Sequence, residues 1–238
     1  VGRVRPADLG VDCMHINLHK TFSTPHGGGG PGAGPVVFSH RLSAYTPLPH
    51  VVRRGQTFHL IEQADGTRSV GRLKGFHGQV GMFIRALAYC LSLGADGLRQ
   101  ASGDAVLNAN YLLARLKDVL SAPYPGACMH EVLFDDSFLR NTGVSTLDFA
   151  KAMIDEGLHP MTMYFPLVVH GALLVEPTES ESRDSLDALV TVMRALAERA
   201  KSGDMAFFQS APRHTPRRRL DETRAARHPV LRWSADPH

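Results

Sequence analysis

The stretch NLHKTFSTPHGGGGPGAG, residues 17–34, carries most of the information about the fold and chemistry of this chain. Residues 14–18 place apolar side chains at alternate positions, which predicts a strand with one face against a core. Six of the eight residues 27–34 are glycines, so the backbone there can adopt positive φ and approach another group closely. A lysine held at a strand end and shielded from water can form a Schiff base with an aldehyde. We therefore predict Lys20 to be a covalent catalyst at the end of this strand.

Further motifs follow this stretch in a fixed order along the chain. They are Ser69-Val70-Gly71-Arg72, Leu107-Asn108-Ala109-Asn110-Tyr111, His130-Glu131, Leu174-Val175-Glu176-Pro177-Thr178-Glu179-Ser180 and Arg219-Leu220-Asp221-Glu222. With residues 17–34, they resemble the glycine dehydrogenase (decarboxylating) family, the pyridoxal-phosphate subunit 2 of the glycine-cleavage P-protein. The resemblance implies pyridoxal 5'-phosphate as a cofactor covalently bound to Lys20. It also implies that His19 contacts the cofactor phosphate or orients the lysine.

The resemblance implies an α/β fold, the C-terminal part of a fold-type I (aspartate-aminotransferase-like) enzyme. We expect the C-terminal remainder of the cofactor-binding large domain at residues 1–105, a small α/β domain at 106–208 and a basic C-terminal tail at 209–238. The chain is expected to be N-terminally truncated relative to the family. The family's upstream Asp-Gly-Ala-Asn segment should lie just before Val1.

The activity that the resemblance implies is decarboxylation of glycine, with transfer of the aminomethyl group to the lipoyl arm of the H-protein. The implied partner is a related subunit 1, in a heterotetramer with two copies of each subunit. Two alternatives stay open. The chain is an inactive fragment that only packs against a partner, or it belongs to another fold-type I enzyme, an aminotransferase or a desulfurase.

Composition excludes several classes of protein. The 238 residues are 43% hydrophobic and 21% charged, as in ordinary globular proteins. A net charge of +3 is too small to argue for nucleic acid or a membrane surface. No apolar run approaches the length of about 20 residues that spans a bilayer, so we expect a cytoplasmic protein. Cys13, Cys90 and Cys128 are far apart in sequence and are expected to be buried free thiols.

Hydrophobic periodicity predicts the remaining elements. Apolar residues spaced by three and four predict an amphipathic helix over 76–93, ending at Gly94, and a second helix over 98–120. Beyond a proline-rich break the chain alternates strand and helix, which is typical of a small α/β domain. Strands are expected at 36–38, 58–61, 130–134 and 171–175, and helices at 148–156 and 182–201.

Competing interpretations of the motifs are weaker. Histidines 15, 19 and 26 do not close on one ion if they follow a strand, so we expect no metal site. Gly27, Gly29 and Gly32 formally match a GxGxxG pattern, but no acidic residue lies about 20 positions further on. The acidic residues 176–182 are interpreted as a strand end followed by a capped helix start.

Overall fold

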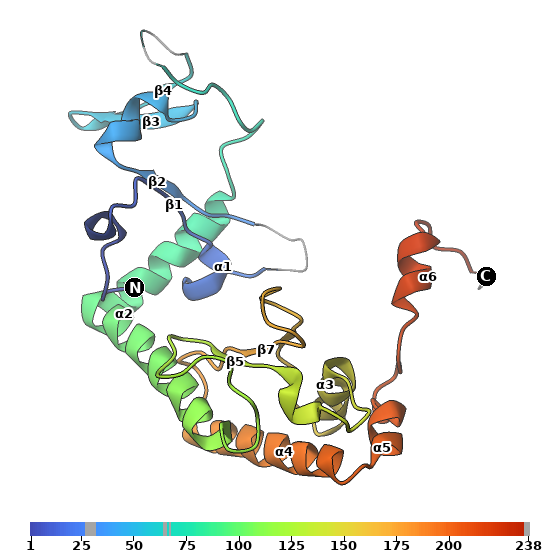
Figure 1. Cartoon of the computed structure of the whole chain (residues 1–238). Helices are drawn as coiled ribbons and strands as arrows, with labels where there is room; N and C mark the ends of the chain where they lie inside the picture. The colour runs from blue at the N-terminus through green and yellow to red at the C-terminus, as the bar shows by residue number, and fades with distance from the viewer. Residues whose placement is uncertain (27–31, 64–65, 67, 236–238) are drawn as a thin grey trace. The chain divides into compact units, whose positions relative to one another are not determined.

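The computed structural model describes residues 1–26, 32–63, 66 and 68–235 of the chain (Figure 1). Its contacts divide the chain into unit 1, Val1–Ala101, and unit 2, Ser102–His238. The predicted domain bounds at 105 and 208 stay predictions. Gly27 and Gly29 of the GxGxxG pattern lie outside the described residues.

Unit 1 contains two small antiparallel sheets and several short helices. Its elements are η1 (Pro6–Leu9), β1 (Cys13–His15), α1 (Leu18–Thr21), β2 (Val36–Phe38), η2 (His40–Tyr45), β3 (His50–Arg54), β4 (Thr57–Ile61) and the first part of α2 (Val80–Leu116). β1 pairs with β2, and β3 pairs with β4. The strands predicted at 36–38 and 58–61 are therefore confirmed.

The prediction of a strand over 14–18 is wrong in its second half. β1 ends at His15, after three register pairs with β2. The backbone amides of Ile16 and Leu18 then bond to the carbonyls of Pro35 and Ala33, at 2.9 and 3.1 Å. From Leu18 the chain turns into the single turn of α1, because Phe22 N bonds back to Leu18 O at 3.2 Å. Lys20 thus lies in a helical turn and not at a strand end.

Helix α2 is interrupted at Gly94, whose φ of +63° is not helical. This is where the sequence predicts the first of two helices to end, although that helix begins at Val80 rather than at 76. Five large apolar side chains on its first part are 41% to 74% exposed. They form what we call the apolar α2 face: Val80, Phe83, Ile84, Leu87 and Leu91.

Unit 2 packs helices against a three-stranded antiparallel sheet in the order β5-β7-β6. Its elements after α2 are β5 (Val132–Phe134), η3 (Asp136–Leu139), α3 (Thr146–Asp155), β6 (Thr162–Met163), β7 (Leu173–Val175), α4 (Arg183–Lys201), α5 (Met205–Ser210) and α6 (Glu222–Arg227). Helix α3 contacts α4 and α5 (Figure 1). The predicted alternation of strands and helices is confirmed.

The caps and the apolar periodicity explain the helices of unit 2. Ser145 accepts from Asp148 N in a capping box at the start of α3, and Ser182 caps α4. The apolar positions of these helices meet in one buried cluster with the sheet. Its largest fully buried members include Leu112, Leu116, Phe134, Phe149, Met193 and Phe208.

The basic segment after α5 is anchored to α3 by two of its arginines. Arg219 forms an ion pair with Asp148 at 2.6 Å and also donates to the Ala211 carbonyl at 2.9 Å. Arg213 forms an ion pair with Asp155 at 3.2 Å. The Asp155 carboxylate is 1% exposed, so this contact is part of the packing of unit 2.

Two further sequence expectations can be compared with the structure. Cys90 and Cys128 are partly buried, but Cys13 is exposed, because its position on the edge of a two-stranded sheet leaves it uncovered. The expectation of three buried thiols is therefore wrong for Cys13. Among the described residues, none of the helices combines the length and apolar character that crossing a bilayer requires.

Candidate active site

The backbone before Lys20 depends on a close approach by one glycine. A Cβ on Gly34 would lie 2.3 Å from the Ile16 carbonyl oxygen and 2.5 Å from the His15 ring. Any side chain would therefore force apart the two segments that join β1 to β2. The sequence predicts that glycines in this stretch allow a close approach to another group, and this prediction is confirmed at Gly34.

Helix α1 presents the predicted site residues from a buried anchor. Leu18 is 6% exposed and fixes the turn to the rest of unit 1. His19 is partly buried, while Lys20 is exposed. The single turn of α1 thus carries the exposed amine of Lys20 and the partly buried imidazole of His19 at adjacent positions.

His19 belongs to a group of basic side chains. Its ring lies edge-on to His26, with ring centroids 4.6 Å apart. Burial is the main cause that lowers the pKa of His19, followed by the charges of His26, Lys20 and His15. The lowered pKa favours the neutral form of the His19 imidazole.

The Nδ1 atom of His19 is buried and has no hydrogen-bond partner among the residues that the structure describes. A buried polar atom without a partner is costly, so such atoms are rare unless a ligand uses them. Together with Lys20 and His26, it provides one amine and two imidazoles around one short turn. This donor set fits a small molecule that carries an aldehyde and an anionic group, as pyridoxal phosphate does.

Sequence reasoning missed one residue at this site. Arg85, on the first part of α2, donates from Nε to the carbonyl oxygen of Ser23 at 2.5 Å. Ser23 has a φ of +56°, in the left-handed region that non-glycine residues seldom adopt. No local pattern marks Arg85, because its partner is a backbone carbonyl 62 residues away in sequence.

The motifs of unit 2 mainly hold loops in place. The Asn110 amide bonds to both the carbonyl and the amide of Cys128, at 2.7 and 3.0 Å. Asn108 donates to the Thr178 carbonyl at 2.8 Å. The hydroxyl of Tyr111 donates to Asp187. Asn110 and Asn108 thus connect α2 to the loop after it and to the loop before α4, and Tyr111 connects α2 to α4 itself.

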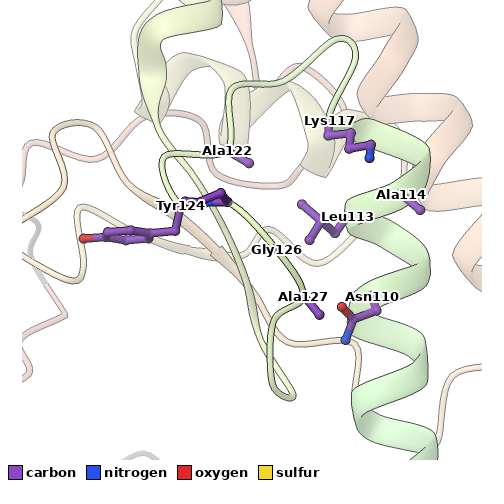
Figure 2. Close-up of a pocket in the computed structure, with 9 residues that line it drawn as sticks. Asn110, Leu113, Ala114, Lys117, Ala122, Tyr124, Gly126 and Ala127 are labelled. Atoms are coloured by element: carbon purple, nitrogen blue, oxygen red, sulfur yellow. The ribbon is translucent and has the colours of Figure 1, made fainter.

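A cavity of about 470 Å³ lies between α2 and the loop that Asn110 holds (Figure 2). Besides Asn110, its wall includes Leu113, Lys117 and Tyr124. The Asn110 amide is used by backbone groups, because it also donates to the Val106 carbonyl at 2.8 Å. The cavity is thus formed by a structural loop contact, and none of the predicted site residues lines it.

One cluster in unit 2 places carboxylates around a histidine. His130 Nε2 lies 3.9 Å from an oxygen of Glu131 and 3.9 Å from an oxygen of Glu176. The antiparallel pairing of Val132 with Val175 explains why the two glutamates are close, since Glu131 precedes Val132 and Glu176 follows Val175 at the same end of the sheet. All three side chains are at least 36% exposed, as is common for carboxylates at strand ends that bind no metal.

Comparison with known proteins places these observations in a family. The probable glycine dehydrogenase (decarboxylating) subunit 2 of Caulobacter vibrioides is 65% identical to this chain, over 98% of this chain and 45% of its own length. The chain is a homologue of glycine dehydrogenase (decarboxylating) subunit 2. The corresponding protein of Kosmotoga olearia is 50% identical over 98% of this chain and 48% of its own length. The predicted family resemblance is confirmed, and the chain spans about half the length of these relatives.

Two further comparisons agree with the relationship to glycine dehydrogenase. Residues 101–214 match the family model described as glycine dehydrogenase, C-terminal domain. The fold resembles the crystal structure of glycine decarboxylase (P-protein) of the glycine cleavage system, in inhibitor-bound form. The TM-score is 0.64, with 20% sequence identity over 82% of this chain and 46% of that chain. The predicted fold class, the C-terminal α/β part of a fold-type I enzyme, is thereby confirmed.

Proposed function

We propose that this glycine dehydrogenase homologue supplies Lys20, the cofactor lysine of a pyridoxal-phosphate enzyme that decarboxylates glycine. The main support is the cluster of Lys20, His19 and His26, in which the buried His19 Nδ1 has no hydrogen-bond partner within the described ranges. The names of the homologous chains agree with this activity.

The residues of this chain have separate tasks in the proposed reaction. Pyridoxal phosphate, when bound, accepts the electron pair that remains when carbon dioxide leaves glycine. Lys20 holds the cofactor covalently through Nζ and, once released, its amine moves a proton at the substrate carbon. His19, whose neutral form is favoured by burial and by its basic neighbours, can donate one hydrogen bond to the cofactor phosphate.

The partners follow from the same proposal. The aminomethyl group passes to the lipoyl arm of an H-protein, and a related subunit 1 completes a heterotetramer with two copies of each subunit. The homologues carry the words subunit 2 in their names, which supports a second kind of subunit. We place the reaction in the cytoplasm.

The test is reduction of the purified chain with borohydride after addition of pyridoxal phosphate, followed by peptide mapping. The proposal predicts that the cofactor is trapped on Lys20 and that Lys20→Ala removes this label. Lys74→Ala is the matched control, because Lys74 is a lysine of the same unit outside the site. Label spread over many lysines, or label unchanged in Lys20→Ala, contradicts the proposal.

A second candidate is a non-catalytic chain that packs against a partner subunit. The exposure of Lys20 and of the apolar α2 face favours it, since both leave surface that another chain could cover. Exchange of labelled carbon dioxide into glycine, measured with subunit 1 and H-protein added, separates the candidates. Loss of exchange in Lys20→Ala supports catalysis, and exchange that survives supports packing. Exchange of the amino group of other amino acids would instead indicate an aminotransferase.

A further inference from the structure

The turn that follows α1 has an unusual backbone at Ser23. Its φ of +56° lies in the left-handed region, where the side chain of a non-glycine residue crowds its own backbone. Such conformations persist only where surrounding contacts impose them, and they cluster at functional sites. Ser23 lies three positions after Lys20, so the contacts that impose this backbone act directly beside the cofactor lysine.

The carbonyl of Ser23 accepts a hydrogen bond from Arg85. The charged guanidinium donates from Nε to the Ser23 carbonyl at 2.5 Å, and charge-assisted bonds of this kind are short and comparatively strong. Both residues belong to unit 1. The left-handed conformation sets the direction of this carbonyl, so the bond and the unusual backbone favour each other.

The consequence reaches the histidine cluster through a stiff segment. Pro25 restricts the backbone between Ser23 and His26, because its ring fixes φ. His26 in turn meets the His19 ring at 4.6 Å. A change in direction at Ser23 therefore displaces His26 from His19.

We propose that Arg85 is a positioning residue, which holds the turn at Ser23 so that His26 stays against His19 beside Lys20. This inference rests on the proposed function, in which Lys20 carries the cofactor. Arg85 acts through the backbone of Ser23 and needs no contact with the cofactor itself.

The first measurement is the fraction of Lys20 trapped by borohydride at a pyridoxal-phosphate concentration that half-labels the unchanged chain. Because the hydrogen bond is charge-assisted but exposed, Arg85→Ala should lower the apparent affinity about fivefold. Arg85→Lys keeps the charge without the planar fork and should restore only part of the loss. Arg54→Ala removes an exposed arginine from β3 and should have no effect.

The second measurement follows the His19 imidazole by NMR titration. If His26 moves away in Arg85→Lys, the pKa of His19 should rise toward its usual value, and the retained charge excludes a direct effect of charge removal. Ser23→Gly adopts positive φ without crowding, so replacing Arg85 in that background should cost less label than in the unchanged chain.

Three results overturn the inference. They are unchanged labelling in Arg85→Ala, an unchanged His19 titration in Arg85→Lys, and an equal loss of label on replacing Arg85 with or without Ser23→Gly. If Arg85→Ala does not fold, Arg85→Lys and the Ser23→Gly background still decide. If the unchanged chain shows no label on Lys20, the proposed function fails, while the His19 titration still tests the Arg85 contact.

Discussion

Asp155 is the more deeply buried of the two carboxylates that anchor the basic segment to α3. Its Oδ1 accepts from the Arg213 and His214 backbone amides at 2.6 and 2.9 Å, and Oδ2 accepts from Arg213 Nε at 3.2 Å. We consider Asp155→Asn, which keeps the size of the side chain and removes its charge. The amide group retains one acceptor oxygen, so only part of this network can survive.

The expected loss can be estimated from these contacts. Removing one partner of a buried ion pair costs about 3–5 kcal/mol. The side chain of Arg213 is 34% exposed, so water replaces part of what it loses. We therefore expect Asp155→Asn to cost about 2–3 kcal/mol. Since 1.4 kcal/mol is a factor of ten, amides at the end of α3 should exchange about 30–150 times faster.

Hydrogen exchange measured by mass spectrometry on peptides of α3 tests this estimate locally, without assuming that the two units unfold together. Asp118→Asn is the control. Asp118 makes a bidentate pair with Arg194 at 2.7 Å, but its side chain is 58% exposed, so its removal should change exchange much less. Equal effects of the two substitutions would refute the importance of burial at Asp155.

The dependence on pH has a defined sign. Burial raises the pKa of Asp155, but hydrogen bonds from His214 and Arg213 outweigh it and hold the pKa below its usual range. Because the pKa of Asp155 is lower in the folded state than in the unfolded state, its ionised form stabilises the fold. This contribution is fully present above the unfolded-state pKa of about 3.9, and it is lost as pH falls through the lower pKa of the folded state. Thermal unfolding between pH 3 and 7 should therefore show a steeper acid loss in the unchanged chain than in Asp155→Asn.

Three further predictions concern other sites. The hydrogen bond that the His170 ring donates to the Asp136 carboxylate raises the pKa of His170. This contact therefore stabilises unit 2 fully below pH 6.5, the usual pKa of histidine, and its contribution is lost as pH rises through the higher pKa of the folded state. In Asp136→Asn, NMR titration should find the His170 pKa back near its usual value, and an unchanged titration would contradict the assignment. Gly171→Ala should destabilise by about 2 kcal/mol in urea unfolding, because Gly171 has φ of +56° and a Cβ there would lie 2.2 Å from the Asp136 carboxyl. Iodoacetamide should modify exposed Cys13 before Cys128, whose pKa is raised by burial; the reverse order in peptide mapping would contradict the burial pattern.

The sequence predicts unit 2 better than unit 1, and the reason is physical. The apolar periodicity of α3 and α4 is a local signal, and both helices begin and end within two residues of the ranges expected at 148–156 and 182–201. In unit 1, alternation before Lys20 suggests a strand as far as Leu18, but β1 ends at His15 and the chain turns into α1 at Leu18, where Phe22 N bonds back to Leu18 O.

Contacts between distant residues explain what sequence reasoning missed at the candidate site. The bond of Arg85 to the Ser23 carbonyl depends on how α2 lies against the turn, and no residue near Arg85 in sequence encodes it. The exposure of the apolar α2 face could not be predicted for the same reason. Periodicity predicts which residues share a helix face, but it does not predict whether another segment of the chain covers that face. Gly34 was only partly predictable. The sequence shows a glycine at this position, but it does not show that the His15 ring lies where a Cβ would be.

The motifs that carry the family resemblance divide into two physical classes. In unit 1, Lys20 has an exposed amine, and the buried Nδ1 of His19 has no hydrogen-bond partner within the described part of the chain. In unit 2, the side-chain amides of Asn108 and Asn110 form hydrogen bonds with backbone groups of neighbouring loops. Substitution of the asparagines should therefore lower stability, whereas substitution of Lys20 or His19 should leave the fold intact and remove cofactor binding. A motif that identifies the family is thus evidence for chemistry only where its polar atoms remain available.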